Sequence, residues 1–254
     1  MKDQQIIVCE DNESLAHWAA RRFVYSAAQA IKRAGRFTVA LAGGSTPRSL
    51  YALLATPSWS AEVAWDKVHL FWGDERHVPP DTQESNYRMA HETLIRCVPI
   101  PADNVHRVIS EEERAESAAE KYEQELRAFF ELGVGDLPRF DLILLGLGPD
   151  GHTASLFPGT EVLDETTRLV AAPWVPKFSA YRITLTLPVL NNAIEIMFLV
   201  SGREKAAKVR EVTQETASLA LPAQLVRPRD GELLWVIDRA AASELPGDAA
   251  VTSA

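Results

Sequence analysis

Short apolar runs alternate with amphipathic stretches along most of the chain. Apolar runs of strand length, bounded by Gly, Pro or polar residues, predict strands, whereas apolar positions spaced at three and four residues predict helices between them. Alternation of this kind predicts an α/β fold with a mainly parallel central sheet. The predicted strands lie at residues 6–9, 37–42, 68–72, 105–108, 140–145, 181–186, 195–200 and 232–238.

Two helices are well marked by their sequence. After the first strand, apolar residues including Leu15 and Phe23 fall on one helical face, which predicts a core-facing helix that Asn12 caps and Gly35 ends. Residues 111–132 predict a long helix in which acidic and basic residues are interspersed, which is typical of a solvated face. The tail from residue 244 onwards is small and polar, so we expect it to fray.

The segment 140–159 carries the most informative pattern. An almost unbroken apolar run, typical of a strand buried on both faces, leads into a turn rich in Gly and Pro. Asp150 and His152 lie at the end of that turn. Because ligands of open α/β sheets bind beyond the carboxyl ends of the strands, this position favours a catalytic His. Asp150 by itself is equally typical of an ordinary Asp-Gly turn.

A second strand runs directly into Gly43, Gly44, Ser45 and Thr46, and Pro47 then suits the first turn of a helix. Glycines allow close backbone approach, and the free N–H groups and dipole of a helix start favour an anion. The loop lacks the ending of a Walker motif and the spacing of a dinucleotide fingerprint. The pattern therefore favours the phosphate of a monophosphate ester, although a plain strand–helix turn also fits it.

Two further polar clusters follow predicted strands. Asp74 and Arg76 come after the strand at 68–72, and Lys205 comes after the strand at 195–200. An arginine or lysine at such a place can bind a phosphate or an oxyanion, whereas a surface ion pair or a solvated lysine is the structural alternative. Glu75 and His77, beside them, are expected to be structural or solvated.

Composition limits the class of protein. The 254 residues are 46% hydrophobic, which suits one domain spanning 1–254. A net charge of −9 disfavours a nucleic-acid surface. Cys9 and Cys97 are far apart, as expected for intracellular thiols. The polar N-terminus predicts no signal peptide and the apolar runs are too short for a membrane span, so we expect a soluble cytoplasmic protein without membrane partners.

Together, residues 41–47, 72–76, 146–158 and 201–206 resemble the 6-phosphogluconolactonase family, over nearly the whole chain. The resemblance implies a modified Rossmann-like three-layer fold and hydrolysis of 6-phospho-D-glucono-1,5-lactone in the oxidative pentose phosphate pathway. The sister family of glucosamine-6-phosphate deaminases is the nearest alternative, but its catalytic Glu before a Pro is replaced here by Leu156 and Phe157. A sugar-phosphate sensor that binds without turnover is another alternative, which the absence of a DNA-binding helix pair before Ile6 disfavours.

The resulting hypothesis assigns a role to each polar group. His152 takes a proton from water, Asp150 or Asp74 orients it, and Arg76 stabilises negative charge on the substrate. Arg182 is expected at the rim of the site. No cofactor or metal is expected, the partner is a small sugar-phosphate lactone, and the protein is expected to be a monomer or homodimer. The residues expected to hold the phosphate are Gly43, Gly44, Ser45, Thr46, Arg48 and Lys205.

Overall fold

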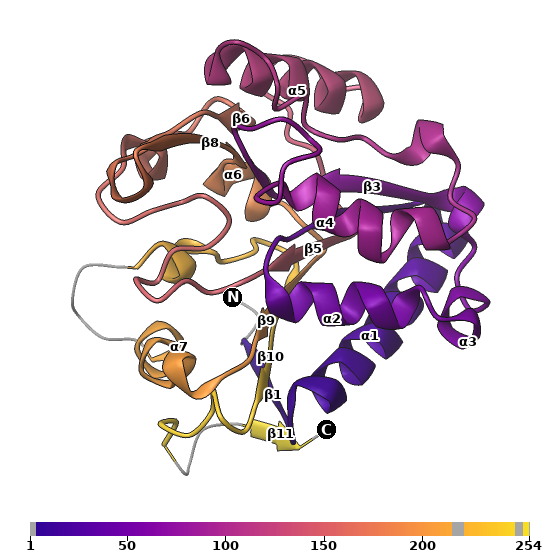
Figure 1. Cartoon of the computed structure of the whole chain (residues 1–254), viewed down its shortest axis with the longest axis vertical. Coiled ribbons are helices and arrows are strands. Elements are labelled where there is room, and N and C mark those ends of the chain that lie inside the picture. The colour runs from indigo at the N-terminus through magenta and orange to yellow at the C-terminus, as the bar shows by residue number, and fades with distance from the viewer. Residues whose placement is uncertain (1–3, 215–220, 247–250, 254) are drawn as a thin grey trace.

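The computed structural model describes residues 4–214, 221–246 and 251–253. Within them, helices and strands alternate along most of the chain (Figure 1). The α-helices are α1 Asn12–Ala34, α2 Ser45–Leu54, α3 Pro57–Ser60, α4 Asn86–Thr93, α5 Ala115–Phe129, α6 Leu187–Leu190 and α7 Ala206–Thr213. The strands are β1 Gln5–Cys9, β2 Phe37–Leu41, β3 Val68–Trp72, β4 Asp74–Arg76, β5 Leu142–Leu145, β6 Val170–Ala171, β7 Trp174–Val175, β8 Ala180–Leu185, β9 Glu195–Val200, β10 Glu232–Asp238 and β11 Val251–Ser253.

The central sheet has seven strands in the order β11-β1-β10-β9-β5-β2-β3, and every pair in it is parallel. All residues of β2, β5 and β9 are buried, as expected for parallel strands covered on both faces. Figure 1 shows α1 and α2 on one side of this sheet and α7 on the other. The carboxyl ends of β9, β5, β2 and β3 therefore meet at one edge of the sheet.

A smaller antiparallel sheet, in the order β4-β8-β6 with β7 also paired to β8, lies beside that edge. Gly73 separates β3 from β4 and is held by both sheets. Its N–H donates to Leu41 O at 2.9 Å, and its carbonyl accepts from Leu185 N at 2.9 Å. The chain thus passes from the end of β3 directly into the second sheet, where α5 packs on β6 and β8. This crossing places β4 at the mouth of the strand-end cleft.

Most predicted elements are confirmed, and four expectations are wrong. Asp11, not Asn12, caps α1, because its carboxylate accepts from Ser14 N at 2.8 Å, whereas Gly35 ends the helix in the left-handed conformation as expected. The charged helix α5 is shorter than predicted. Residues 105–108 form no strand, and only an isolated bridge joins Val105 to Leu70.

The C-terminal tail is the fourth correction. Residues 251–253 form β11, which pairs in parallel with β1 at the edge of the central sheet, so this part of the tail does not fray. Residues 247–250 and 254 lie outside the described residues. The hydrogen bonds that β1 offers at the sheet edge explain why a short polar segment becomes a strand.

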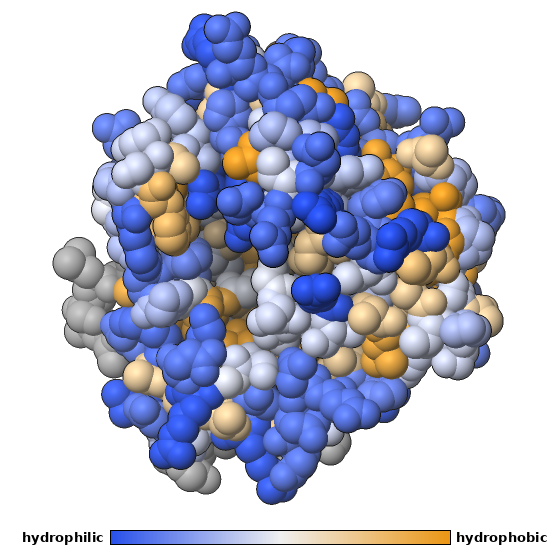
Figure 2. Space-filling model, viewed as in Figure 1, coloured by the Kyte–Doolittle hydropathy of each residue, from blue (hydrophilic) through white to orange (hydrophobic). Residues whose placement is uncertain are grey.

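The face of the molecule in Figure 2 is mostly hydrophilic, with apolar residues in small separate patches. Among the described residues, no helix is both long enough and apolar enough to cross a bilayer. The apolar side chains instead gather in a core that includes the buried Trp65, Trp72 and Trp235.

Candidate active site

A pocket of about 330 Å³ opens at the shared carboxyl edge of the central sheet. Segments that follow β2, β3, β5 and β9 supply its walls. It brings together residues that lie far apart in the sequence, because neighbouring parallel strands end at the same edge. The polar side chains and loop residues predicted for the site that line this pocket are Gly43, Gly44, Ser45, Thr46, Asp74, Arg76, His152 and Lys205.

His152 and Asp150 form a hydrogen-bonded pair on the loop after β5. His152 Nδ1 faces Asp150 Oδ1, so Nδ1–H donates to the ionised carboxylate. Burial alone would raise the pKa of the Asp150 carboxyl, but hydrogen bonds from His152 and Lys177 outweigh it and hold this pKa well below its usual range. A tight turn of the loop brings the two side chains together. Gly151 adopts a φ of 81°, and Gly148 N donates to His152 O at 2.8 Å. Nε2 has no partner among the described residues.

The imidazole of His152 is packed on two sides. Its ring stacks on Phe157, with 4.1 Å between ring centroids. On the other side it lies against Gly148, where a Cβ atom would stand only 2.0 Å from Nδ1 and Cε1. These contacts fix the ring orientation that the pair with Asp150 requires.

The loop after β2 presents backbone donors to the same pocket. Gly44 precedes α2 with a φ of 103°, which favours glycine, and the first N–H groups of α2 at Ser45 and Thr46 lack partners within the helix. Gly43 allows close packing, because a Cβ atom there would meet Asn86 Oδ1 at 2.0 Å. A helix start with free N–H groups and hydroxyls is well suited to a phosphate.

Two cations accompany this loop. Lys205 ends a 3₁₀ turn, Arg203–Lys205, directly after β9, and its Nζ donates to Leu147 O at 2.9 Å. Arg76 ends β4 and donates from Nη1 to Glu84 O. Both line the pocket, so positive charge is available on two of its sides.

Asp74 forms hydrogen bonds with residues other than His152. Its carboxylate accepts from Ser155 Oγ at 2.6 Å and from Asn86 Nδ2 at 3.4 Å, and Asn86 Nδ2 also donates to the Asp74 carbonyl at 2.9 Å. Of the two carboxylates considered as partners of the imidazole, Asp150 is therefore the one in contact with it. Asp74 instead ties the end of β3 to the loop that carries His152.

Comparison with known proteins decides the family. Residues 10–235 match the profile of the glucosamine-6-phosphate isomerases/6-phosphogluconolactonase family. The chain belongs to this family.

A 6-phosphogluconolactonase of Nostoc sp. is 45% identical over 85% of this chain and 88% of that protein, and one of Synechocystis sp. is 42% identical over the same shares. A solved 6-phosphogluconolactonase from Trypanosoma brucei is 31% identical, with a TM-score of 0.85, and covers 96% of this chain and 99% of that chain. The expected α/β fold with a mainly parallel sheet is confirmed by these neighbours. A solved glucosamine-6-phosphate deaminase, 22% identical with a TM-score of 0.77, shares the fold.

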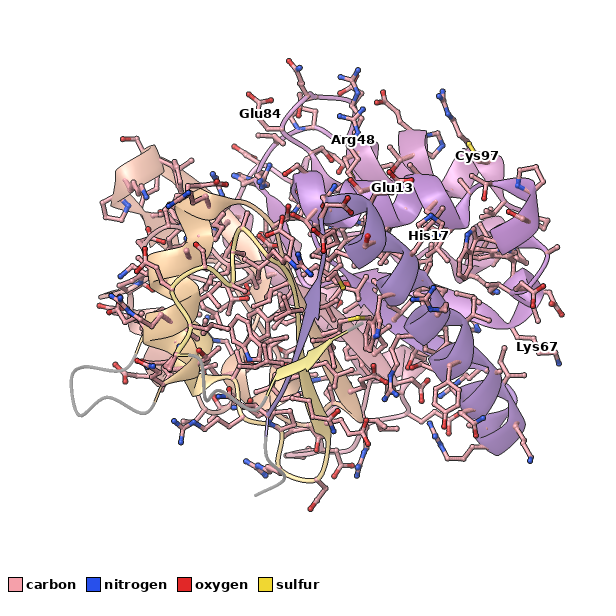
Figure 3. All side chains as sticks on the ribbon, turned by 90° about the horizontal axis from the view of Figure 1, so that it is seen from below. Glu13, His17, Arg48, Lys67, Glu84 and Cys97 are labelled. Atoms are coloured by element: carbon pink, nitrogen blue, oxygen red, sulfur yellow. The ribbon has the colours of Figure 1, made fainter. Side chains whose placement is uncertain are left out.

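Three of the residues predicted for the site, Asp150, Arg48 and Arg182, do not line the pocket, and Asp150 adjoins it through His152. Arg48 is exposed on α2, and Figure 3 shows it at the same edge of the molecule as Glu84, away from Lys67. Arg182 lies on β8 opposite Arg76 in the antiparallel ladder. Burial and the charge of Arg76 lower the pKa of Arg182. Arg182 is thus beside the site, in contact with its cationic wall, rather than in the pocket.

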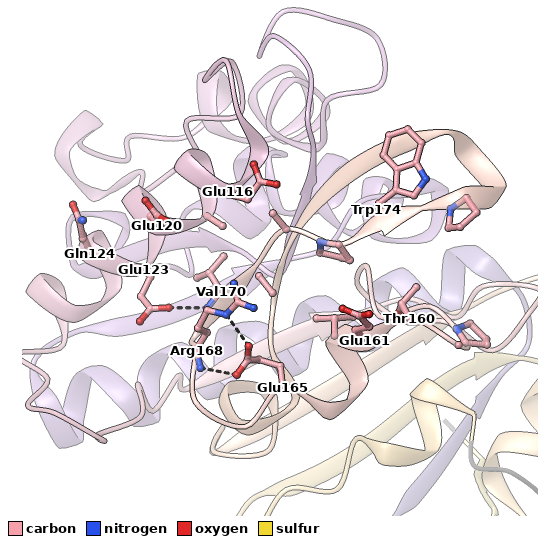
Figure 4. A pocket seen from close by; sticks show the side chains of 18 of the residues that line it. Glu116, Glu120, Glu123, Gln124, Thr160, Glu161, Glu165, Arg168, Val170 and Trp174 are labelled. Atoms are coloured by element: carbon pink, nitrogen blue, oxygen red, sulfur yellow. Dashed lines mark hydrogen bonds and ion pairs between the residues drawn. The ribbon is translucent and has the colours of Figure 1, made fainter.

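A second and larger hollow, of about 710 Å³, lies between α5 and the segment around β6 (Figure 4). Two of its glutamates serve the fold: Glu123 accepts from Leu169 N at 2.9 Å, and Glu165 pairs with Arg168 at 2.7 Å. None of the described residues that line it is a His or a Lys. Among the described residues, no group of three His, Cys, Asp or Glu side chains is arranged to hold a metal ion.

Sequence reasoning missed three polar residues around the pocket. Asn86 and Ser155 are not among the residues predicted for the site, although both hold Asp74. Ser155 lies within the family motif at 146–158, which was the available signal for it, whereas Asn86 lies outside the quoted motifs and gave none. Lys177, which donates to Asp150 Oδ2 at 3.0 Å, gave no signal, because it lies 27 residues from Asp150, and nearly as far from His152, in a short turn that follows no predicted strand.

Proposed function

We propose that this family member hydrolyses 6-phospho-D-glucono-1,5-lactone to 6-phospho-D-gluconate, the second step of the oxidative pentose phosphate pathway. The observation that carries the proposal is that His152, paired with Asp150, lines one pocket with a helix-start anion site and Lys205. The relatives named 6-phosphogluconolactonase, at up to 45% identity among those compared, support the same reaction.

In the proposed reaction, neutral His152 accepts at Nε2 a proton from the attacking water, and the water oxygen bonds to the lactone carbonyl carbon. Asp150 holds Nδ1–H and favours the imidazolium as it forms. The tetrahedral intermediate then expels the ring oxygen, which takes the proton back from His152. The ester bond is broken, and the carboxylic acid that forms loses its proton to solvent at neutral pH.

Substrate binding is assigned to the other walls. The N–H groups and hydroxyls at Ser45 and Thr46, with Lys205, hold the phosphate. Arg76 stabilises negative charge on the substrate, and Asp74 keeps the His152 loop against β3. This division leaves no role in phosphate binding for Arg48, which lies outside the pocket.

The proposal is tested by generating the lactone in situ from glucose 6-phosphate and following acid release above the spontaneous rate. Wild type is expected to accelerate hydrolysis, and His152→Ala is expected to lower kcat by roughly two to four orders of magnitude. Arg48→Ala is the matched control at the surface and is expected to behave as wild type.

Other outcomes of the assay lead to different conclusions about the function. If wild type gives no acceleration, lactonase activity is ruled out; deamination of glucosamine 6-phosphate is then assayed, and binding without turnover indicates a sensor. If His152→Ala is as fast as wild type, the reaction stands and the base lies elsewhere. The expected cytoplasmic location and the monomeric or homodimeric state stay predictions.

A further inference from the structure

A lysine outside the pocket completes a chain of three ionisable groups. Lys177 Nζ donates to Asp150 Oδ2 at 3.0 Å, while Asp150 Oδ1 accepts from His152 Nδ1. The two oxygens of one carboxylate thus bridge an ammonium and an imidazole. The side chains of His152 and Asp150 are 21% and 29% exposed, whereas that of Lys177 is 52% exposed, so the bridge runs from the pocket to the surface.

The segment that carries Lys177 is anchored against the site. Lys177 lies in a 3₁₀ turn, Pro176–Phe178, and Ser179 ends this turn in the left-handed conformation with a φ of 47°. Phe178 packs edge-to-face on Phe157, with 5.7 Å between centroids, and Phe157 in turn stacks on His152. The aromatic contacts therefore connect the turn that carries Lys177 to the imidazole, while the two side chains bind different oxygens of Asp150.

We propose that Lys177 is a positioning residue that fixes the Asp150 carboxylate and limits how strongly it favours the imidazolium form of His152. This inference rests on the proposed function, in which His152 must be neutral to accept a proton. The negative charge of Asp150 stabilises an imidazolium, and the positive charge of Lys177 offsets part of that stabilisation. The lysine thereby keeps the base available at lower pH than the Asp150 pair alone would allow.

Other charged groups lie in the pocket or beside it. Lys205 and Glu204 follow β9, and Asp74 and Arg76 lie on β4. Arg182, on β8, lies over the Phe178 ring with its guanidinium carbon 5.1 Å from the centroid. A change confined to position 177 leaves all five of these groups in place, so any shift in the behaviour of His152 reports on Lys177.

The test compares wild type with Lys177→Met, which removes the charge and keeps the chain length, and Lys177→Arg, which keeps the charge. Lys67→Met is the matched control, because this exposed lysine precedes β3 and so lies at the opposite edge of the sheet from the pocket. For each protein, kcat/KM for the lactone is measured from pH 5 to 8. The Cε1–H resonance of His152, assigned by its loss in His152→Gln, is titrated by NMR over the same range.

In Lys177→Met, the midpoint of the His152 titration and the acid limb of kcat/KM are expected to move up together by about 0.3–0.7 pH units, the size set by a partly exposed ion pair. Lys177→Arg and Lys67→Met are expected to match wild type. A His152 midpoint in Lys177→Met equal to that of wild type overturns the inference. The proposed function fails separately, if wild type does not hydrolyse the lactone or if His152→Ala retains full kcat, and the inference then falls with it.

Discussion

At the scale of single residues, the orientation of His152 depends on a glycine. A Cβ atom at position 148 would stand 2.0 Å from two ring atoms of His152, and Phe157 blocks retreat on the other side. Gly148→Ala must therefore turn the imidazole away from Asp150. Because a displacement of about 1 Å can cost roughly 100-fold in rate, we expect kcat to fall by about 10- to 100-fold. Steady-state kinetics with a thermal melt of the same variant test this, and an unchanged kcat would contradict the packing.

Substitutions of Lys205 and of Arg48 are expected to affect KM differently. Lys205 lines the pocket beside the anion-binding loop, whereas Arg48 is exposed outside it. If Lys205 binds the phosphate in ground state and transition state alike, Lys205→Met should raise KM by about 10-fold or more and change kcat little. Arg48→Met should leave both constants as in wild type. A raised KM in the Arg48 variant and not in the Lys205 variant would reverse the assignment.

Local sequence could predict the strand-end residues but not their partners. His152 and the loop 43–46 were expected in the site because each follows an apolar strand with turn glycines. That Asp150, and not Asp74, contacts His152 depends on the turn geometry at Gly151 and on Ser155 reaching Asp74. The Ser155–Asp74 bond joins segments distant in sequence, and the Asp150–His152 contact, although local, depends on the backbone conformation of the turn. Periodicity and spacing encode neither.

At the scale of elements, α4 is held at its start by a buried carboxylate from β4. Glu75 accepts from the N–H groups of Asn86 and Tyr87, both at 2.7 Å, and from Ser85 Oγ at 3.0 Å. Its side chain completes what the Ser85 cap begins, since helix starts leave N–H groups unpaired. The acid thereby fixes Asn86, which holds Asp74 in the pocket.

Glu75→Ala is therefore expected to destabilise the fold. It leaves several buried donors unpaired, which together cost about 2–4 kcal/mol in the free energy of unfolding. Glu84→Ala, at an exposed position on the same connection, should change stability by less than about 0.5 kcal/mol. Urea-induced unfolding measures both. Equal stabilities of the two variants would show that the Glu75 contacts do not hold α4.

Most strands and helix ends follow from local patterns, and the exceptions have tertiary causes. The fully buried strands β2, β5 and β9 are continuous apolar runs, so their type is clear from the sequence. β4 is a charged segment whose pairing with β8 makes it a strand, and β11 is a polar segment that the free edge of β1 recruits. Both segments become strands only through pairing with a neighbouring strand, so the local sequence does not predict them.

At the scale of the whole molecule, the order of the strands assembles the site. The chain order of the strands does not reveal that β9, β5, β2 and β3 are neighbours, yet this arrangement alone brings Lys205, His152, the anion-binding loop and Asp74 to one edge. The alternation of strands and helices predicts the fold class, and the family resemblance adds the three-layer arrangement. The residues around Lys177 lie in a local hairpin of β7 and β8, and the long-range pairing of β8 with β4 carries this hairpin to the same edge.

A histidine pair between β3 and α5 gives this assembly a pH-dependent stability. His69 Nδ1 lies 3.1 Å from His106 Nε2, and His106 Nδ1 lies 2.7 Å from Glu125 Oε1 on α5. Burial, followed by the charges of His106 and Arg36, lowers the pKa of His69 from 6.5 to about 4. The unfolded chain therefore binds a proton at this residue below about pH 6.5, whereas the folded protein binds it only near pH 4.

It follows that the contribution of neutral His69 to stability is complete above about pH 6.5 and is lost as the pH falls towards 4. One proton sets an upper limit of about 1.4 kcal/mol per pH unit, which partial exposure to solvent reduces. In His69→Asn, the free energy of unfolding should therefore decline less between pH 7 and 5 than in wild type, whereas the exposed His91→Asn control should decline as wild type does. Urea unfolding at both pH values measures the difference, and parallel declines in all three proteins would show that His69 ionises alike in the folded and unfolded chains.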